Sequence, residues 1–355
     1  MSGGVDSSVA AALLVEQGYE VIGITLQLYD HGAAVGRKGA CCAGQDIHDA
    51  RRVGERLDIP HYVLDFEARF RNAVIEDFAQ TYASGRTPIP CVRCNQRIKF
   101  RDLLEVARDL GAAGLATGHY VRKVEADTGP ELHQAVDDGR DQSYFLFATT
   151  PAQLDFLHFP LGGLLKAATR KLARRLDLPV AEKPDSQDIC FVPEGRYDRI
   201  VKKLRPEAGE PGEIVDEAGR HLGEHDGIAG FTVGQRRGIR VAAAGRRYVT
   251  RVEPSSRRIV VGPCEATMAL QAELDEVNWL AAAPADGLSV QVKCRARQPL
   301  VPARWHARAD GRAMVTFDQP QPAVAPGQAL VAYAGSRLLG GGWITSAVRA
   351  APQAS

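Results

Sequence analysis

The sequence predicts an α/β protein. It is expected to begin with a doubly wound parallel-sheet domain at 1–195, to continue with a small mixed α+β domain at 196–273 and to end in a β-barrel at 274–350. Strand-like and helical segments alternate in the first half, which is typical of a parallel sheet covered by helices. From residue 193 onward, glycine, proline and short β-prone runs dominate, which favours antiparallel strands joined by turns. A length of 355 residues also suits two or three domains better than one.

The elements of the first domain follow from hydrophobic periodicity and turn residues. A helix is expected to begin at Asp6, Ser7 and Ser8, whose side chains suit a helix start, and to stop at Gly18. We expect strands at 20–29, 60–66 and 112–121 and further helices at 46–59, 67–85 and 99–111. Ligands of such sheets bind beyond the carboxyl ends of the strands.

The second half contains short β-branched and aromatic runs bounded by turn residues. We expect antiparallel strands at 212–219, 247–254, 258–263, 288–297, 313–319 and 328–344.

The composition is that of an ordinary globular enzyme, with 45% hydrophobic and 25% charged residues. The longest apolar run near the start, at 9–15, is too short to cross a bilayer. No basic segment precedes that run, so it lacks the form of a secretion signal. We therefore expect a cytoplasmic protein with no membrane association.

Charge is distributed unevenly between the two halves. Residues 1–195 carry 22 Lys and Arg against 27 Asp and Glu, whereas 196–355 carry 22 against 16. The basic segment (residues 231–258) has one acid, Glu253, and eight arginines: Arg236, Arg237, Arg240, Arg246, Arg247, Arg251, Arg257 and Arg258. Such a segment suits a polyanion, and an ordinary solvated surface is the alternative.

Seven cysteines, an odd number in a long chain, argue against a disulfide framework. Cys91 and Cys94 form a Cys-x-x-Cys pair, which is compatible with a redox pair, half a zinc site or iron–sulfur ligands. The adjacent pair Cys41 and Cys42 has a poor chelating spacing. We expect these two, Cys264 and Cys294 to be small buried or half-buried residues.

The opening stretch "SGGVDSS" (residues 2–8, the N-terminal loop) is a glycine turn that enters a helix. Such a turn offers free backbone N–H groups and the positive end of the helix dipole to an anion. Gly3 and Gly4 allow close approach of a phosphate, and serine hydroxyls add donors. Asp6 would repel phosphate, so its carboxylate suits Mg²⁺ instead. The loop lacks the lysine of G-x-x-x-x-G-K-[ST] ATPases.

This loop resembles the pyrophosphate loop of the N-type ATP pyrophosphatases, which split ATP between the α and β phosphates. The segments "GRTPIPCVRCNQRIKF", "ATGHY", "RDQSYFL" and "SQDICF" follow in order, and "GFTVGQRRGI", "PGQALVAY" and "LLGGGWI" extend the likeness. The whole chain resembles the bacterial tRNA-specific 2-thiouridylases. In that family a strand precedes the loop, so we expect the first strand of the sheet to be missing here.

The resemblance implies ATP-dependent transfer of sulfur to C2 of the wobble uridine of tRNA, through an adenylated uridine and a cysteine persulfide. It implies that Cys190 carries the persulfide and that Cys94 completes the reaction, leaving a Cys94–Cys190 disulfide. It further implies ATP and Mg²⁺ as cofactors, with Asp6 as the Mg²⁺ ligand. The implied partners are the tRNA anticodon stem-loop and an upstream protein that donates persulfide sulfur.

Other positions are carried over from the family's motifs. The resemblance implies ATP contacts at Ser2, Gly3, Gly4, Val5, Asp6, Ser7, Ser8, Leu26 and Gly118. It implies contacts to the target base or the tRNA at Ile89, Pro90, Cys91, Arg140, Asp141, Gln142, Arg295 and Ala296. The family often has an aromatic residue at 296, so the stacking contact is lost here and Arg295 and Arg297 are expected to bind phosphate.

Three alternatives remain open. Many relatives carry Asp at position 91, and Cys91 could join Cys94 and Cys190 in a [4Fe–4S] cluster with one open iron. An amidating synthetase of the same superfamily would need neither paired cysteines nor a basic second half. A non-enzymatic RNA-binding protein would not need to keep Asp6, Cys94 and Cys190.

Overall fold

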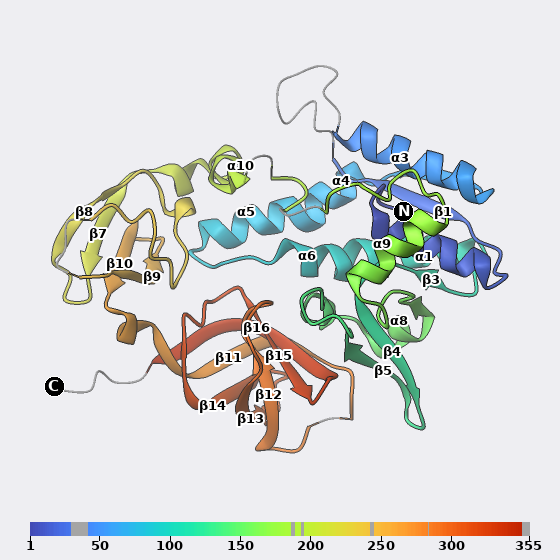
Figure 1. The fold of residues 1–355 in the computed structure, drawn as a ribbon. Helices are drawn as coiled ribbons and strands as arrows, with labels where there is room; N and C mark the ends of the chain where they lie inside the picture. The colour runs from blue at the N-terminus through green and yellow to red at the C-terminus, as the bar shows by residue number, and fades with distance from the viewer. Residues whose placement is uncertain (30–41, 186–188, 193–194, 242–244, 283, 350–355) are drawn as a thin grey trace. The chain divides into compact units, whose positions relative to one another are not determined.

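The computed structural model describes residues 1–29, 42–185, 189–192, 195–241, 245–282 and 284–349 (Figure 1). The chain forms two compact units. Unit 1 comprises Met1–Val74, Cys91–Phe191 and Ser336–Leu338. Unit 2 comprises Ile75–Pro90, Val192–Gly335 and Leu339–Ser355.

Unit 1 has the predicted alternation of helices and parallel strands. Strand β1 (Gly23–Gln27) pairs in parallel with β2 (His61–Asp65), and β3 (Leu115–Ala116) pairs in parallel with β6 (Leu157–His158). The strand expected at 112–121 is therefore wrong in length. It ends at Ala116, because the next residues turn away toward the N-terminal loop.

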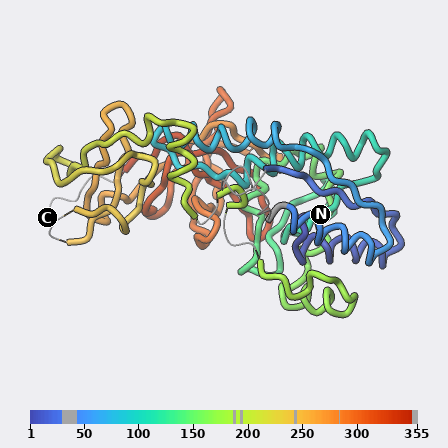
Figure 2. The backbone as a smooth tube through the Cα atoms, turned by 90° about the horizontal axis from the view of Figure 1, so that it is seen from above, coloured from blue at the N-terminus to red at the C-terminus, as the bar shows by residue number. Residues whose placement is uncertain are grey.

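The first helix, α1 (Val5–Glu16), lies against α3 (Cys42–Leu57) and α9 (Lys166–Arg175) (Figures 1 and 2). Its apolar residues Val5 and Val9 are buried in the core of unit 1, together with Tyr120 and Leu161. The helix starts one residue earlier than predicted, with Gly4 as its N-cap and no capping side chain. The hydroxyls of Ser7 and Ser8 donate to the Gly4 carbonyl, so neither serine caps the start of the helix.

Two of the predicted helices are interrupted by π-helical turns. The first consists of α4 (Glu67–Phe70), a π-helix at Arg71–Ile75 and α5 (Glu76–Ala83). The second consists of α6 (Pro90–Arg93), a π-helix at Cys94–Asp102 (η2) and α7 (Leu103–Asp109). π-helical turns are rare and frequently lie at functional sites, and η2 begins at a predicted catalytic cysteine.

The remaining elements of unit 1 were not predicted. Strands β4 (Val121–Ala126) and β5 (Gly129–Gln134) form a hairpin, and β5 also pairs with Arg337 and Leu338. A short 3₁₀ turn at Ser143–Leu146 and α8 (Pro151–Phe156) lead toward α9.

Unit 2 begins its second part with α10 (Tyr197–Leu204) and a four-stranded sheet. The strands of this sheet, in spatial order, are β8 (His221–His225), β7 (Gly212–Asp216), β10 (Arg258–Gly262) and β9 (Tyr248–Glu253). Strands β7 and β10 pair in parallel, so the expectation of wholly antiparallel strands is wrong here. The long connection between these two strands leaves room for a parallel crossover.

The predicted C-terminal barrel is confirmed. Six strands follow the order β11-β14-β13-β12-β15-β16, and pairing of β11 with β16 closes the ring. They are β11 (Met268–Trp279), β12 (Leu288–Lys293), β13 (Val301–Ala307), β14 (Ala313–Pro322), β15 (Ala329–Ala334) and β16 (Arg337–Arg349). Trp305, Val315 and Leu330 are fully buried in the barrel interior. Strands β8, β11 and β13 were not predicted. In β11 and β13 buried residues alternate with more exposed ones, but the polar side chains on their outer faces lower the hydrophobicity of the segments.

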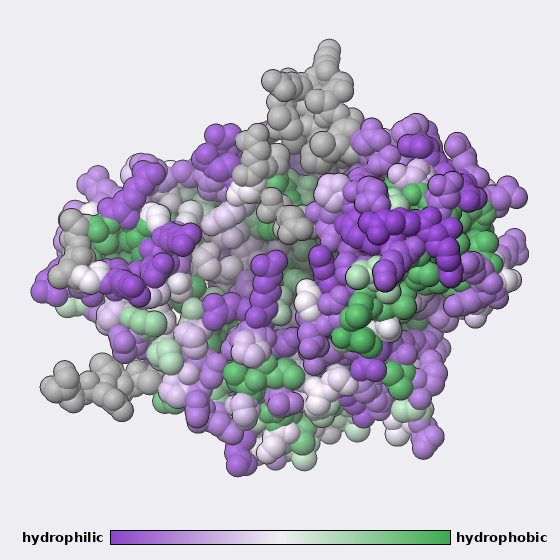
Figure 3. Space-filling model, viewed as in Figure 1, coloured by the Kyte–Doolittle hydropathy of each residue, from purple (hydrophilic) through white to green (hydrophobic). Residues whose placement is uncertain are grey.

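Hydrophilic side chains predominate on the face drawn in Figure 3, and apolar ones gather in small separate areas. Within the part of the chain that the structure describes, no helix combines the length and hydrophobicity that a membrane crossing requires.

Candidate active site

The N-terminal loop is tightly built. Gly3 has a φ of +69°, and a Cβ there would lie 2.2 Å from the backbone oxygen of Asp46. Only glycine fits such a position. Ser2 donates its backbone N–H to the Ser7 hydroxyl over 3.0 Å, and the Ser8 hydroxyl donates to the Gly4 carbonyl over 2.9 Å. Ser8 is fully buried, so its hydroxyl is committed to the loop itself.

Gly118 holds the turn after β3 directly against this loop. A Cβ at Gly118 would lie 2.7 Å from the backbone nitrogen of Ser7 and 2.8 Å from the carbonyl carbon of Asp6. Real side chains do not tolerate contacts this short, so the close approach requires glycine. Leu26, the other predicted nucleotide contact outside the loop, lies half-buried on β1 opposite Leu64.

Replacing Gly118 with alanine is expected to displace the N-terminal loop. We expect ATP affinity to fall by about tenfold or more and unfolding free energy to drop by about 1–3 kcal/mol, as for an overpacked contact. Calorimetric ATP titration and thermal unfolding measure the two effects. Gly163→Ala is the matched control, because nothing lies within 4 Å of a Cβ there. Unaltered ATP binding in G118A would contradict a role for this close approach.

The Asp6 carboxylate is held by two residues from distant parts of unit 1. Lys166 Nζ lies 2.7 and 2.8 Å from its two oxygens. The Tyr120 hydroxyl donates to Oδ1 over 2.9 Å. Burial raises the pKa of Tyr120, and the Asp6 charge adds to this effect, so the phenol keeps its proton.

Asp6 is also the residue predicted to bind Mg²⁺. Its side chain is 32% exposed. Protein sites for Mg²⁺ often supply only one or two carboxylates and leave the other positions to phosphates and water. The single Asp6 carboxylate fits that requirement, with Lys166 as the competing cation.

Asp185 gathers three cations near the same place. Its carboxylate oxygens lie 2.8 Å from Lys166 Nζ, 2.8 Å from Arg170 and 2.9 Å from Arg140. Burial alone would raise the pKa of Asp185, but the hydrogen bond and charge of Lys166, with the two arginines, lower it overall. The carboxylate is therefore ionised at neutral pH.

The predicted tRNA-contacting residues of this region all have partners within unit 1. Arg140 is ion-paired with Asp185. Asp141 accepts hydrogen bonds from the backbone N–H groups of Ala135 and Ser143, and Gln142 accepts one from the backbone of Tyr120. Their contact with tRNA remains a prediction.

A second lysine, Lys183, locks the loop from another side. Its ammonium donates to the Gly3 carbonyl over 3.0 Å, and it lies 2.7 Å from Asp46 and 2.5 Å from Asp49. Neither Lys166 nor Lys183 was singled out from the sequence. Both lie far from the loop along the chain, so no local pattern pointed to them.

The three cysteines of the predicted chemistry all belong to unit 1. Cys91 lies on α6 and is exposed, Cys94 is buried at the start of η2, and Cys190 is exposed. Crowding by protein atoms, followed by the nearby Cys94 and Cys91, raises the pKa of Cys190 to about 12. Burial also raises the pKa of Cys94, and loss of solvation among the surrounding protein atoms raises that of Cys91 although its residue is exposed. Protein atoms therefore surround much of the Cys190 sulfur, although the residue as a whole remains exposed to solvent.

Cys94 and Cys190 are both free thiols in the described part of the chain, so the implied disulfide is not formed in this structure. Cys294 is buried in the barrel, as expected for a small core residue. Cys264 is exposed, so the expectation of burial is wrong for it, because it lies on a short surface 3₁₀ turn at Cys264–Thr267. Cys41 and the side chain of Cys42 lie outside the described residues.

Lys99 is a further residue of the three-thiol site (Cys91, Cys94 and Cys190) that sequence reasoning missed. Against the raising effect of burial, its charge lowers the pKa of each thiol. It follows Cys94 by five residues, about one π-helical turn. In a regular α-helix the side chains at positions 94 and 99 would point in different directions, so the sequence alone did not place them together.

Replacing Lys99 with methionine is expected to raise the pKa of the thiols further. Iodoacetamide should then label Cys190 about three- to tenfold more slowly at pH 8, and the rise of the labelling rate with pH should move to higher pH. Mass spectrometry of labelled peptides gives the rate at each cysteine. Lys203→Met, at an exposed position, is the control. Equal rates in K99M and wild type would refute this electrostatic role.

The predicted target-base residues differ in accessibility. Ile89 and Pro90 are buried, whereas Cys91 is exposed. His119, which follows Gly118, accepts or donates a hydrogen bond with the Thr117 hydroxyl at 2.8 Å. Burial holds the pKa of His119 well below its ordinary value, so the ring is neutral.

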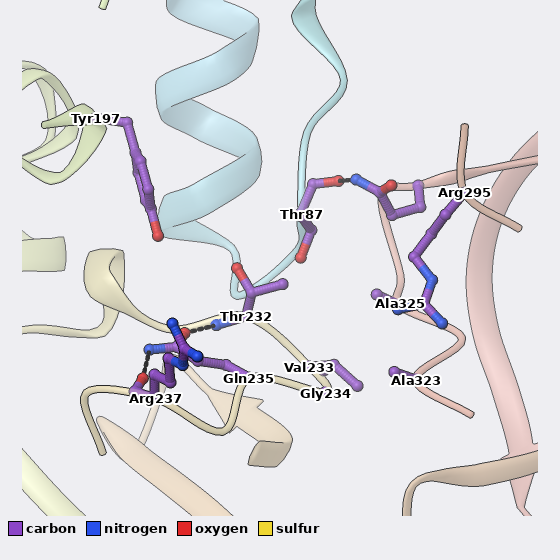
Figure 4. Close-up of a pocket in the computed structure, with 11 residues that line it drawn as sticks. Thr87, Tyr197, Thr232, Val233, Gly234, Gln235, Arg237, Arg295, Ala323 and Ala325 are labelled. Carbon is purple, nitrogen blue, oxygen red and sulfur yellow. Dashed lines mark hydrogen bonds between the residues drawn. The ribbon is translucent and has the colours of Figure 1, made fainter. Parts of the chain in front are cut away.

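Unit 2 contains a pocket of about 490 Å³ that includes the predicted tRNA contact Arg295 (Figure 4). Arg295 lies on one side of this pocket, and Arg237 lies with Gln235 on the other. Arg295 also donates to the Pro322 carbonyl over 3.1 Å, while the neighbouring Ala296 is half-buried. Two guanidinium groups on opposite sides suit an anionic ligand.

The sequence suggested that the arginines of the basic segment have almost no acidic partners, but the structure pairs several of them with glutamates. Three of its arginines form ion pairs with acids from other parts of unit 2: Arg251 with Glu217, Arg257 with Glu210 and Arg258 with Glu213. Four others are exposed and have no acidic partner among the described residues: Arg236, Arg237, Arg240 and Arg246. The latter four are the better candidates for RNA phosphates.

Comparison with known proteins covers almost the whole chain. Residues 1–194 match a family model described as a tRNA methyl transferase HUP domain, 199–263 a tRNA methyl transferase PRC-barrel domain, and 271–344 an aminomethyltransferase β-barrel domain. The chain is 64% identical to the tRNA-specific 2-thiouridylase MnmA of Rhodospirillum centenum, over 98% of this chain and 91% of that protein. It is 58% identical to the protein of the same name from Parvibaculum lavamentivorans, over 97% and 89%. It is 55% identical to the Rickettsia felis protein, over 98% and 96%.

Proposed function

Because the chain belongs to the tRNA-specific 2-thiouridylase family, we propose that it is a tRNA-uridine sulfurtransferase that uses ATP to replace the C2 oxygen of the wobble uridine with sulfur. The observation that carries the proposal is that Cys94 and Cys190, which are far apart in the sequence, belong to the same compact unit as the N-terminal loop, and that the charge of Cys94 contributes to the raised pKa of Cys190. Sulfur transfer by two cysteines requires thiols that can meet.

The first step activates a poor electrophile. The C2 oxygen of the uridine attacks the α-phosphorus of ATP, the α–β phosphoanhydride bond breaks, and pyrophosphate leaves. The N-terminus of α1 and the glycines of the loop offer backbone N–H groups to the phosphates. Mg²⁺ bound at Asp6 would shield the charge of the leaving pyrophosphate.

The second step transfers sulfur. The terminal sulfur of a persulfide on Cys190 attacks C2, and AMP departs with the original oxygen. Cys94 then attacks the Cys190 sulfur, so the S–S bond to the base breaks and thiouridine is released. The products include a Cys94–Cys190 disulfide, which a cellular dithiol must reduce. An upstream protein must supply the persulfide sulfur.

The raised pKa of the Cys190 thiol supports a persulfide, and not the bare thiolate, as the attacking group. With a pKa near 12, the Cys190 thiol is almost entirely protonated at neutral pH and is a weak nucleophile. A persulfide is more acidic than its parent thiol, so loading with sulfur activates the residue.

The iron–sulfur alternative is less well supported by these residues. Among the residues that the structure describes, no three His, Cys, Asp or Glu side chains are arranged to hold a metal ion. Cys91, Cys94 and Cys190 as they lie do not fit a cluster, and no step is assigned to one. Anaerobically purified protein with a brown colour and visible absorbance would favour the cluster.

The decisive experiment is nucleoside analysis of tRNA after incubation with ATP, Mg²⁺ and a persulfide source. We expect 2-thiouridine to appear, with release of pyrophosphate that depends on tRNA. An amidating synthetase would release pyrophosphate without regard to tRNA, and a plain RNA-binding protein would release none. Either of those outcomes would overturn the proposal.

A double substitution tests the proposed RNA contact of the basic segment. In Arg236→Ala with Arg237→Ala, tRNA affinity should fall by about tenfold, and its dependence on salt should weaken by about two phosphate contacts. Filter binding at several salt concentrations measures both. Arg257→Ala with Arg258→Ala is the matched control, because both arginines already pair with glutamates. An equal loss of tRNA affinity in the two double variants would argue against specific binding of RNA phosphates by Arg236 and Arg237.

A further inference from the structure

We propose that Cys91 is a resolving thiol, which moves the disulfide of the oxidised enzyme away from Cys190. This inference rests on the proposed sulfur transfer, whose products include a Cys94–Cys190 disulfide. Cys91 and Cys94 form a Cys-x-x-Cys pair, and the proposed transfer uses only the second of these two cysteines. A third free thiol therefore belongs to the same compact unit as the two reacting cysteines, without a step assigned to its sulfur.

The backbone holds Cys91 and Cys94 about one helical turn apart. Both lie in a continuous helical run, in which α6 leads directly into η2. Arg93, at the junction, has a φ of −61° and a ψ of −38°, which are α-helical values. Residues three apart in an α-helix have Cα atoms about 5 Å from each other, within the range of about 4.4–6.8 Å that disulfides span. A Cys91–Cys94 disulfide therefore needs only an approach of about 1–2 Å between the two Cβ atoms.

The cysteines differ in their accessibility to a reductant. Cys94 is buried, with 9% exposure, and the side chain of the adjacent Asn95 donates to the Phe145 carbonyl over 3.2 Å, which fixes this part of the helix. Cys91 and Cys190 are both exposed. A dithiol that attacks the Cys94–Cys190 disulfide must therefore bind to Cys190, the sulfur that has to be reloaded. Once the disulfide joins Cys91 to Cys94, the dithiol attacks Cys91 and leaves Cys190 free.

The step is a thiol–disulfide exchange, which consumes neither oxidant nor reductant. The Cys91 thiolate attacks the Cys94 sulfur, a Cys91–Cys94 bond forms and the Cys94–Cys190 bond breaks. The proton that Cys91 loses is taken up at Cys190, whose pKa of about 12 favours the thiol form. Loss of solvation raises the pKa of Cys91, but the charge of Lys99 lowers it and so increases the thiolate fraction. A cellular dithiol later reduces the Cys91–Cys94 disulfide and is itself oxidised to a disulfide.

Disulfide connectivity after a single turnover tests the proposal. Persulfide-loaded protein is mixed with ATP, Mg²⁺ and substrate tRNA without reductant, quenched with acid, alkylated and digested with trypsin, which cleaves after Arg93, between the two cysteines. Per thiouridine formed, wild type should contain at least about tenfold more Cys91–Cys94 than Cys94–Cys190 linkage, with Cys190 alkylated. Cys91→Ser should retain the Cys94–Cys190 linkage. Cys264→Ser, at an exposed cysteine of unit 2, is the control and should give the wild-type pattern.

Wild-type protein in which the Cys94–Cys190 linkage predominates after turnover, with Cys91 alkylated, would overturn the proposal. If C91S does not fold, as judged by thermal unfolding, the linkages of the wild-type protein decide the matter. The same linkages, measured without tRNA after equilibration in a glutathione redox buffer, do not depend on turnover. Protein that favours the Cys91–Cys94 linkage in this buffer but does not thiolate tRNA would overturn the proposed function and leave the pairing of these cysteines intact. A predominant Cys94–Cys190 linkage in the buffer would overturn the exchange itself.

Discussion

Cys190→Ser is expected to lower tRNA thiolation by at least about 10⁴-fold, as for removal of an essential nucleophile, while tRNA-dependent pyrophosphate release stays within about twofold of wild type. The reason is that serine cannot carry the transferable sulfur, whereas adenylation of uridine uses the N-terminal loop and needs no thiol. Nucleoside mass spectrometry measures the first quantity, and a pyrophosphate assay with substrate tRNA measures the second.

The matched control is Cys264→Ser, at an exposed cysteine of unit 2 outside the three-thiol site. It should thiolate tRNA at the wild-type rate. Thiouridine formation that survives in C190S would remove Cys190 from the mechanism. Loss of both activities in C190S would instead indicate that the substitution disturbs adenylation.

Asp6→Asn is the second change with a large expected effect. Pyrophosphate release should fall by about 100-fold or more, because the amide is a much weaker Mg²⁺ ligand and no longer balances the charge of Lys166. The Mg²⁺ concentration needed for half-maximal release should also rise. Steady-state assays across a Mg²⁺ titration separate the two effects.

Asp127→Asn, at an exposed aspartate in the turn between β4 and β5, is the control and should behave like wild type. A D6N enzyme with reduced release but an unchanged Mg²⁺ requirement would show that Asp6 acts through Lys166 and does not bind the metal. Full activity of D6N would exclude both roles.

Some features of the fold could be predicted because their signals are local. The apolar run after the N-terminal loop predicted α1, and β-branched runs between turns predicted β1, β2 and most barrel strands. Strands β11 and β13 were not predicted because they carry polar residues on their outer faces and, in β13, a proline. The two π-helical turns could not be predicted from the sequence for a different reason. Their residues have ordinary helical propensities, and packing decides the extra residue per turn.

The basic segment shows that the composition of a segment does not tell which of its charged side chains are paired in the folded protein. Along the chain it has a single acid, yet Glu210, Glu213 and Glu217 come from neighbouring strands and turns to pair with its arginines. Pairs on exposed surfaces contribute little stability, about 0–1 kcal/mol each, but they neutralise charge that RNA would otherwise meet. The candidates for phosphate contact are thereby narrowed to the arginines that remain without an acid in the described part of the chain.

The sequence by itself determined the chemistry available to this protein: a glycine-rich anion loop, a carboxylate at Asp6, and two cysteines in recognisable motifs. Tertiary structure alone decided which groups meet. It placed Lys166 on Asp6, 160 positions away, and Lys183 on Gly3, 180 positions away. The physical reason is that loop chemistry and helical propensity depend on neighbouring residues, whereas ion pairs and coupled thiols depend on how distant segments pack, which no local pattern records.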